Sequence, residues 1–268
     1  MWAKARNKTA QGGARAGQTR AAPSWTWTVV GLTLAVALWG WGSTQLSSIA
    51  LPSPVETAEA LARLTATGAA FPALLETGLR VIAAFSAALA IGAGLGLAAG
   101  FAVPVRAAIG PLVTMLLAVP PIAWVVLALI WFGTGSPAVM FTVFIAVLPI
   151  IFLAAVEGVR TVDPELSEMA KAFRMTRRQM LRHVTLPHLG SYLLPACITA
   201  FGIAWKVCVM AELLSAREGV GSGLADARAN LDTAETFAWL IIVVSAFLLI
   251  EALVLRPAHR WLQPWRAA

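Results

Sequence analysis

The stretch from Ala107 to Val156 reads AAIGPLVTMLLAVPPIAWVVLALIWFGTGSPAVMFTVFIAVLPIIFLAAV and contains 50 residues without one charged side chain. A helix needs about 20 apolar residues to cross the hydrocarbon core of a bilayer. The stretch is therefore long enough for two crossings. The turn-forming run Gly133-Thr-Gly-Ser-Pro137 interrupts it, so we expect one span at about 110–132 and another at about 138–156.

The composition of the whole chain has the same character. Of its 268 residues, 59% are hydrophobic and only 12% are charged, and the mean hydropathy is +0.78. A soluble domain carries about 25% charged residues, so this chain has too few to cover a soluble globule. A soluble enzyme, a disulfide scaffold and a disordered tail are excluded. The composition predicts an all-α membrane protein that crosses the bilayer several times.

Other charge-poor runs predict four more spans. We expect them at about 25–45, 78–101, 190–213 and 236–256, which makes six transmembrane helices within a domain at 25–256. The remainder is a basic tail at 1–24, a charged loop at 157–189 and a short tail at 257–268. Within the second span, Gly92, Gly96 and Gly100 recur every four residues, a spacing that favours close packing of two helices.

The distribution of Lys and Arg predicts the orientation. If the tail before Trp25 is cytoplasmic, 15 of the 20 basic residues lie on that side of the membrane. The positive-inside rule then places both termini in the cytoplasm. The same rule explains the basic tail better than nucleic-acid binding does. Ser48-Ile-Ala50 has the form of a signal-peptide cleavage site, but the apolar run before it is longer than that of a signal peptide, so we expect the first span to be retained.

The loop at 157–189 is the exception to this apolar sequence, and it predicts two short helices. Asp163-Pro164 supplies a capping residue and a first-turn proline for one helix. Thr176-Arg-Arg-Gln179 has the spacing of a capping box for the second, which we expect to end before Pro187. Such a hairpin fits either a docking surface for another protein or a solvated connection.

The segment between these two helices resembles a known motif. Glu168-Met-Ala-Lys-Ala-Phe, followed by Leu186-Pro187, resembles the EAA loop of ATP-binding-cassette (ABC) importer permeases. The resemblance extends over nearly the whole chain after the basic tail. It is closest to the nitrate, sulfonate, taurine and bicarbonate branch of that family, and the motifs that carry it are Leu51-Pro-Ser-Pro-Val-Glu56, Thr77-Gly-Leu-Arg-Val81, Trp131-Phe-Gly133, Ala211-Glu-Leu213 and Gly219-Val-Gly221.

The resemblance implies a type I permease core in a bacterial cytoplasmic (inner) membrane. It implies a second permease copy, two cytoplasmic ABC ATPase subunits that bind ATP and Mg²⁺, and a periplasmic or lipid-anchored binding protein outside. The 214–235 loop would contact that binding protein or serve as a plain linker. The substrate would be a small anion such as nitrate, a sulfonate, taurine or bicarbonate. The chain has no phosphate-binding Gly-x-x-x-x-Gly-Lys-Ser/Thr loop, so it is expected to be non-catalytic and to bind no cofactor itself.

The resemblance also assigns the residues that couple the permease to the ATPase. They are Glu168, Met169, Ala170, Lys171, Ala172, Phe173 and Arg174. Two of them depart from the family's pattern. Met169 is larger than the usual alanine, and Arg174 stands where glycine is usual. A left-handed backbone would cost an arginine roughly 1 kcal/mol relative to glycine, which favours a turn built differently here.

Five residues within the membrane are candidates for the translocation pathway. Lys206 lies deep in a span, where a charge costs roughly 3 kcal/mol or more, and either attracts an anion or has a structural role. Glu212 lies about 240° around the same helix and so does not share its face. Arg80 attracts anions or anchors its helix at the interface. Pro120 and Pro121 break the helical hydrogen-bond ladder, as residues at transport cavities often do.

Other chemistries find little support. The three histidines, His183, His188 and His259, have no neighbours at metal-ligand spacing, so no metal site is expected. Cys197 and Cys208 lie roughly 16 Å apart along one helix and cannot bridge within the chain. The alternative function is an ion-coupled secondary transporter or channel, which would predict internal repeats and intramembrane acids. We find no repeat between the two halves of the sequence.

Overall fold

The computed structural model describes residues 24–255 and residue 257. Most of the two expected tails, 1–24 and 257–268, therefore lies outside the described residues, and their cytoplasmic location stays a prediction. Every regular element within 24–255 is a helix. In chain order, the elements are α1 (Ser24–Gln45), α2 (Pro54–Ala66), α3 (Ala70–Phe101), α4 (Val103–Ala118), α5 (Pro121–Phe132), α6 (Ser136–Arg160), α7 (Pro164–Ala172), α8 (Arg177–Met180), η1 (Leu181–Thr185), α9 (Leu186–Ser215), α10 (Val220–Ala229), α11 (Thr233–Ile250) and η2 (Glu251–Leu255).

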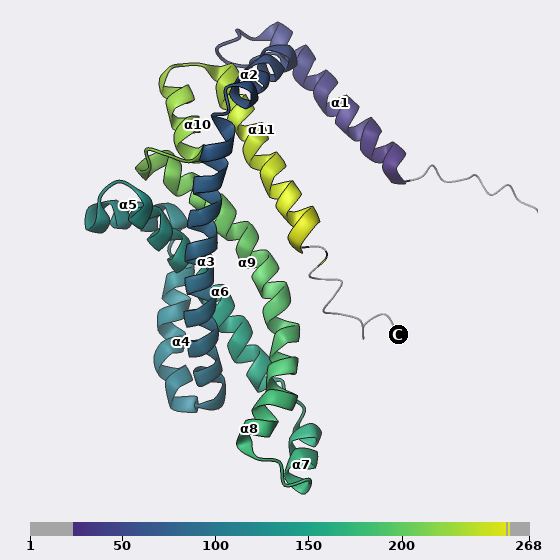
Figure 1. Cartoon of the computed structure of the whole chain (residues 1–268), viewed down its shortest axis with the longest axis vertical. Coiled ribbons are helices and arrows are strands. Elements are labelled where there is room, and N and C mark those ends of the chain that lie inside the picture. Colours follow the sequence, from purple (N-terminus) through teal and green to yellow (C-terminus); the bar gives the residue numbers. More distant parts are fainter. Residues whose placement is uncertain (1–23, 256, 258–268) are drawn as a thin grey trace, which may run out of the picture.

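The core is a bundle of α3, α6 and α9, which run side by side through the middle of the molecule (Figure 1). The glycine ridge of α3 meets α6, as predicted. A Cβ atom at Gly96 would lie 2.5 Å from the Cβ of Ala155, and one at Gly100 would lie 2.5 Å from the Cβ of Val159. Only glycine therefore allows the two helices to approach this closely.

The described part contains four helices that are long and apolar enough to cross a membrane, at Ala70–Phe101, Ser136–Arg160, Arg178–Ser215 and Thr233–Leu253. A fifth crossing is available if α4 and α5 together count as one. The helix α1 has 22 residues but is less apolar than these four. Six spans therefore remain a proposal that depends on α1.

The expected span at 110–132 is not one straight helix but two helices with a break between them, and its crossing of the membrane as one span stays a prediction. The helices α4 and α5 meet at an angle of 100° (Figure 1). Val119 and Pro120 between them have extended backbones, with ψ angles of 124° and 141°. Pro120 restricts the residue before it to extended conformations, and neither proline has an N–H group to continue the helix. The two prolines thus end α4 and start α5 in a new direction.

Two helices that the sequence analysis did not predict, α2 and α10, cover the end of the molecule shown at the top of Figure 1. The helix α2 begins with a complete capping box, because Ser53 and Glu56 each bind the other's backbone N–H group. It packs against α11, and α10 packs against both α9 and α11. The opposite end of the molecule carries α7 and α8.

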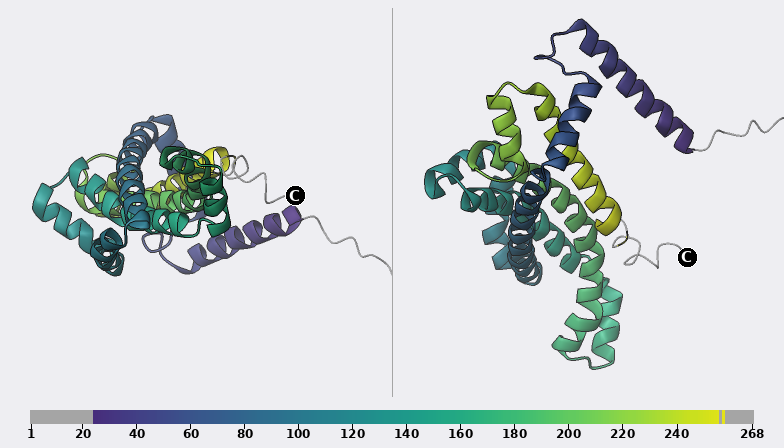
Figure 2. Two further views of the ribbon diagram at one scale, coloured as in Figure 1. Left: turned by 90° about the horizontal axis from the view of Figure 1, so that it is seen from below. Right: turned by 45° about the horizontal axis from the view of Figure 1, so that its top comes forward.

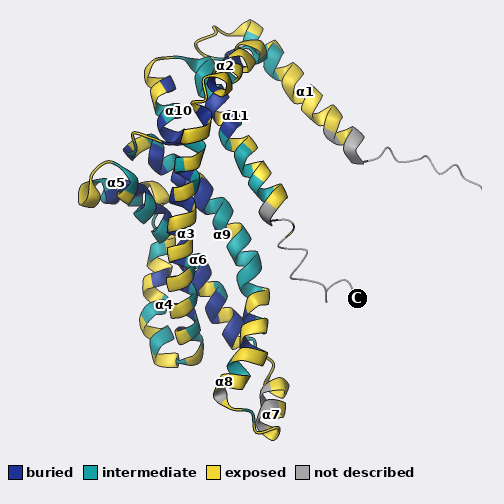
Figure 3. Cartoon of the chain, viewed as in Figure 1, coloured by how far each residue is buried: buried dark blue, intermediate teal, exposed yellow. Residues whose placement is uncertain are grey.

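The first helix, α1, leans away from this body in both views of Figure 2. Its side chains are exposed along most of its length, as the colours of Figure 3 show. Trp39 holds its last turns in place: its indole Nε1 donates to the Pro52 carbonyl oxygen at 2.9 Å, and its ring stacks on Phe237. This apolar helix therefore has its main contacts at one end only.

Candidate functional site

The hairpin of α7 and α8 forms one extremity of the molecule (Figure 1). Asp163 starts it by accepting the backbone N–H of Glu165 at 2.8 Å. The predicted capping box is confirmed: Thr176 N donates to Gln179 Oε1 at 2.8 Å, and Gln179 N donates to Thr176 Oγ1 at 3.3 Å. Both short helices thus start at residues whose side chains satisfy free backbone donors.

The hairpin exposes three large apolar side chains, those of Leu166, Met169 and Phe173. Met169 is 54% exposed and Phe173 is 76% exposed. Residues four apart lie on the same face of a helical turn, so these two form one apolar surface. Glu168 and Ala172 are also exposed, whereas the side chains of Ala170 and Lys171 lie outside the described part. The exposed surface is suited to insertion into a groove on another protein.

Arg174 adopts the left-handed backbone conformation, with a φ angle of 50°. The expectation that this turn would be built differently without a glycine was therefore wrong. The turn has to reverse the chain between the end of α7 at Ala172 and the cap at Thr176, and the left-handed residue achieves this. Arginine can adopt this conformation at a cost of roughly 1 kcal/mol relative to glycine.

The second helix of the hairpin does not end before Pro187, contrary to prediction. α8, η1 and α9 are continuous, and one helix runs from Arg178 to Ser215. Its five residues from Leu181 to Thr185 are a π-helix, and Leu186 N bonds to Leu181 O, five residues back. Pro187 has no N–H group and lies in the first turn of α9. Because the π-helical turn before it shifts the backbone hydrogen-bond pattern by one residue, no hydrogen bond is required from position 187.

A buried ion pair lies at the other end of this long helix. Arg80 of α3 and Glu212 of α9 are joined by a 2.7 Å contact, and their side chains are only 6% and 0% exposed. The other oxygen of the Glu212 carboxylate accepts hydrogen bonds from Thr77 Oγ1 at 2.8 Å and from the backbone N–H of Gly221 at 3.1 Å. The buried carboxylate thus has four partners, because Cys208 Sγ also donates to it at 3.8 Å.

The guanidinium group of Arg80 extends the network to the loop after α9 and to α6. It donates to the backbone oxygen of Glu218 at 2.6 Å and to Ser136 Oγ at 3.0 Å. Glu76, one turn earlier on α3, is 3.6 Å from it. The Gly219-Val-Gly221 motif fits against this network because a Cβ at Gly219 would lie 2.6 Å from the Glu212 carboxylate. The network fastens the loop before α10 to the helical bundle.

The sequence points to Arg80 and Glu212 as separate candidates and does not predict their pairing. The available signal was a single Arg and a single Glu placed near the same end of two different spans. Lys206 is in a different environment: its side chain is exposed on α9, and no hydrogen bond or ion pair to it occurs within the described residues. Pro120 and Pro121 form the bend between α4 and α5. A role for these residues in a pathway stays a prediction.

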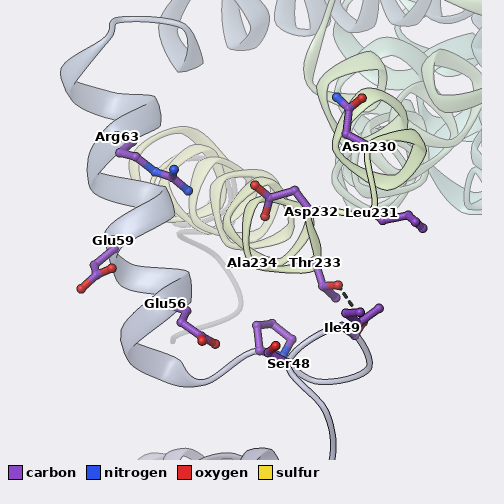
Figure 4. Close-up of a pocket in the computed structure, with 11 residues that line it drawn as sticks. Ser48, Ile49, Glu56, Glu59, Arg63, Asn230, Leu231, Asp232, Thr233 and Ala234 are labelled. Atoms are coloured by element: carbon purple, nitrogen blue, oxygen red, sulfur yellow. Dashed lines mark hydrogen bonds between the residues drawn. The ribbon is translucent and has the colours of Figure 1, made fainter.

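A cavity of about 540 Å³ lies between α2 and the α10–α11 turn (Figure 4). Charged side chains line it from both sides, with Glu56, Glu59 and Arg63 on α2 and Asp232 on the turn. Thr233 Oγ1 crosses to the Ile49 carbonyl oxygen at 2.7 Å. Among residues 24–255, no group of three His, Cys, Asp or Glu side chains is arranged to hold a metal ion.

Comparison with known proteins gives consistent results. The family model described as "Binding-protein-dependent transport system inner membrane component" matches residues 88–267. A bicarbonate transport system permease protein, CmpB of Synechococcus elongatus, is 30% identical over 144 residues, which are 53% of this chain and 50% of the relative. The taurine transport system permease protein TauC of Escherichia coli is 30% identical over 143 residues, 53% of this chain and 52% of the relative.

A nitrate import permease protein, NrtB of Leptolyngbya laminosa, is 32% identical over 133 residues, 49% of this chain and 47% of the relative. The chain thus spans about half the length of the curated relatives it matches. A solved structure of the MetNI methionine ABC transporter has the same fold: its TM-score is 0.57 at 17% identity, over 69% of this chain and 93% of that one. The chain therefore belongs to the binding-protein-dependent transport system inner membrane component family.

Proposed function

We propose that this chain is the permease subunit of an ATP-driven ABC importer and forms the pathway for a small anion such as nitrate, a sulfonate, taurine or bicarbonate. Two copies pair in a bacterial inner membrane, and α1 adds a sixth span with both termini in the cytoplasm. Two separate ATPase subunits bind and hydrolyse ATP with Mg²⁺. The chain itself is non-catalytic and holds no cofactor.

The observation that carries this proposal is the exposed apolar surface of Met169 and Phe173 at the tip of the hairpin. The hairpin is the EAA coupling element, and its apolar surface enters a groove on the ATPase. Glu168 and Arg174 flank that surface with opposite charges. The hairpin end is therefore cytoplasmic, and the end with α2 and α10 faces outward. There the 214–235 region, including α10, meets the binding protein.

The continuous helix from Arg178 to Ser215 suggests how the two ends communicate. Its 38 residues span about 57 Å and connect the hairpin directly to Glu212. When ATP closes the ATPase dimer, the hairpin moves and α9 moves with it. Because Glu212 binds Arg80 and Gly221, a tilt of α9 is transmitted to α3 and to the loop before α10. The cavity between the copies thereby opens outward for the anion, and hydrolysis resets it.

A pull-down tests the proposal. The tagged protein is extracted in mild detergent from its native membrane, alongside a Glu168→Lys variant and a Glu157→Lys control, whose charge change is exposed but lies outside the hairpin. A Walker-motif ATPase should co-purify with the wild type and the control and be depleted from the Glu168→Lys sample. Recovery of the chain alone, with ion-gradient-driven transport in vesicles without ATP, would show it to be a secondary transporter.

A further inference from the structure

Lys206 lies where a charged side chain is costly and points away from the packing of its own chain. It is nine residues before the end of α9 at Ser215, or about 14 Å along the helix axis. Its neighbours Trp205, Val207 and Cys208 are buried, whereas Lys206 is exposed. A stem of four methylene groups is too short to carry the ammonium group to that end of the helix. The charge is therefore held at a depth where it is costly unless it is compensated.

The described part of the chain offers it no compensating carboxylate. The nearest on its own helix is Glu212, which is fully buried and already bound to Arg80, Thr77 and Gly221. Glu76 precedes Thr77 and so lies level with Glu212, six residues or about 9 Å along the axis from Lys206. No hydrogen bond or ion pair involves Lys206 within residues 24–255.

A second copy of the chain does not solve this problem. Its described residues carry the same carboxylates, its own Glu212 is bound to its own Arg80, and it adds a second lysine. Two ammonium groups that face one shared space repel each other. A small oxyanion between them would compensate both charges and accept hydrogen bonds from both, because each ammonium group has three donors.

We propose that Lys206 contacts the transported anion within the membrane, and that the paired lysines of two copies make the pathway selective for small oxyanions. This inference rests on the proposed importer function and deepens it. It assigns selection for negative charge to the permease, in addition to any selection by the binding protein. Arg80 is not part of this contact, because Glu212 and Glu218 already occupy its guanidinium group.

The test uses the assembled transporter of permease, ATPase and binding protein in proteoliposomes. Labelled nitrate, bicarbonate and taurine are the probes, each measured with Lys206→Met, Lys206→Arg and a Thr199→Val control. Thr199 lies seven residues earlier on the same face of α9 and is also exposed. For the anion that the wild type imports, Lys206→Met should lower ATP-dependent uptake at least tenfold. Lys206→Arg and Thr199→Val should stay within threefold of wild type, and ATPase activity stimulated by the binding protein should stay within twofold in all variants.

If the Lys206→Met transporter takes up the anion at the wild-type rate, the inference is overturned and the importer function stays intact. If the wild type itself shows no ATP-dependent uptake, the importer function fails, and a labelling experiment still decides whether Lys206 faces water. For that experiment, Lys206→Cys and a Val244→Cys control are made in a Cys197→Ala, Cys208→Ala background. A membrane-impermeant sulfonate thiol reagent should label position 206 at least tenfold faster than position 244, an exposed apolar site on α11. Equal, slow labelling would place Lys206 against lipid and refute the inference.

Discussion

The buried pair of Arg80 and Glu212 gives the largest effect on stability that this structure predicts. Glu212→Gln keeps the shape of the side chain and an oxygen that can accept from Thr77 and Gly221. It removes the buried counter-ion of Arg80 and leaves only the partly exposed Glu76, 3.6 Å away, as a charged partner. Removal of one partner from a buried pair costs about 3–5 kcal/mol. We expect Glu212→Gln and Arg80→Gln each to destabilise the protein by an amount in this range.

The double variant Arg80→Gln, Glu212→Gln separates the ion pair from the general cost of two substitutions. Because it buries no uncompensated charge, it should be at least as stable as the less stable single variant, and the two single effects should not add. Unfolding in detergent micelles, followed by tryptophan fluorescence, measures all three. The control is Glu157→Gln, which removes an exposed pair with Arg160 at 3.8 Å and should cost about 0–1 kcal/mol. Single effects below 1 kcal/mol, or strictly additive effects, would refute this account of the network.

Two further substitutions test the packing and the hairpin. Gly96→Leu should destabilise the protein by about 1–3 kcal/mol or more, because a Cβ there meets Ala155 and the Phe152 carbonyl oxygen. Gly94→Leu is the control and should leave stability nearly unchanged, because a Cβ at Gly94 has nothing within 4 Å. Equal effects of the two substitutions in thermal unfolding would contradict the close approach of α3 and α6. Arg174→Gly should stabilise the turn of the hairpin by about 1 kcal/mol, because its φ angle of 50° favours glycine. Amide hydrogen exchange at residues 172–176 should then slow about fivefold, and faster exchange would show that the left-handed turn is wrong.

The sequence predicts features that depend on local chemistry. The capping box of Thr176 and Gln179 follows from two side chains and the backbone they bind. The glycine ridge of α3 follows from a repeat of four residues. The apolar runs predict most of the long helices, because a membrane helix has to satisfy its own backbone whatever its neighbours are.

Features that depend on distant segments were missed. The ion pair joins residues 132 positions apart, and no local pattern indicates that Arg80 and Glu212 face each other. The rule that proline ends a helix failed at Pro187, because a π-helical turn shifts the hydrogen-bond ladder before it. The direction of the bend at Pro120 depends on how α4 and α5 pack against α3 and α6, not on the prolines alone.

The central claim is that the hairpin of α7 and α8 docks on a cytoplasmic ATPase. The most direct measurement replaces Phe173, the most exposed apolar side chain of the hairpin, with a photo-crosslinking amino acid in living cells. The control places the same amino acid at Leu231, which is 75% exposed at the opposite end of the molecule. Mass spectrometry should identify an adduct with a Walker-motif ATPase from position 173 and none with that ATPase from position 231. An ATPase adduct from position 231, or only lipid adducts from position 173, would contradict the account.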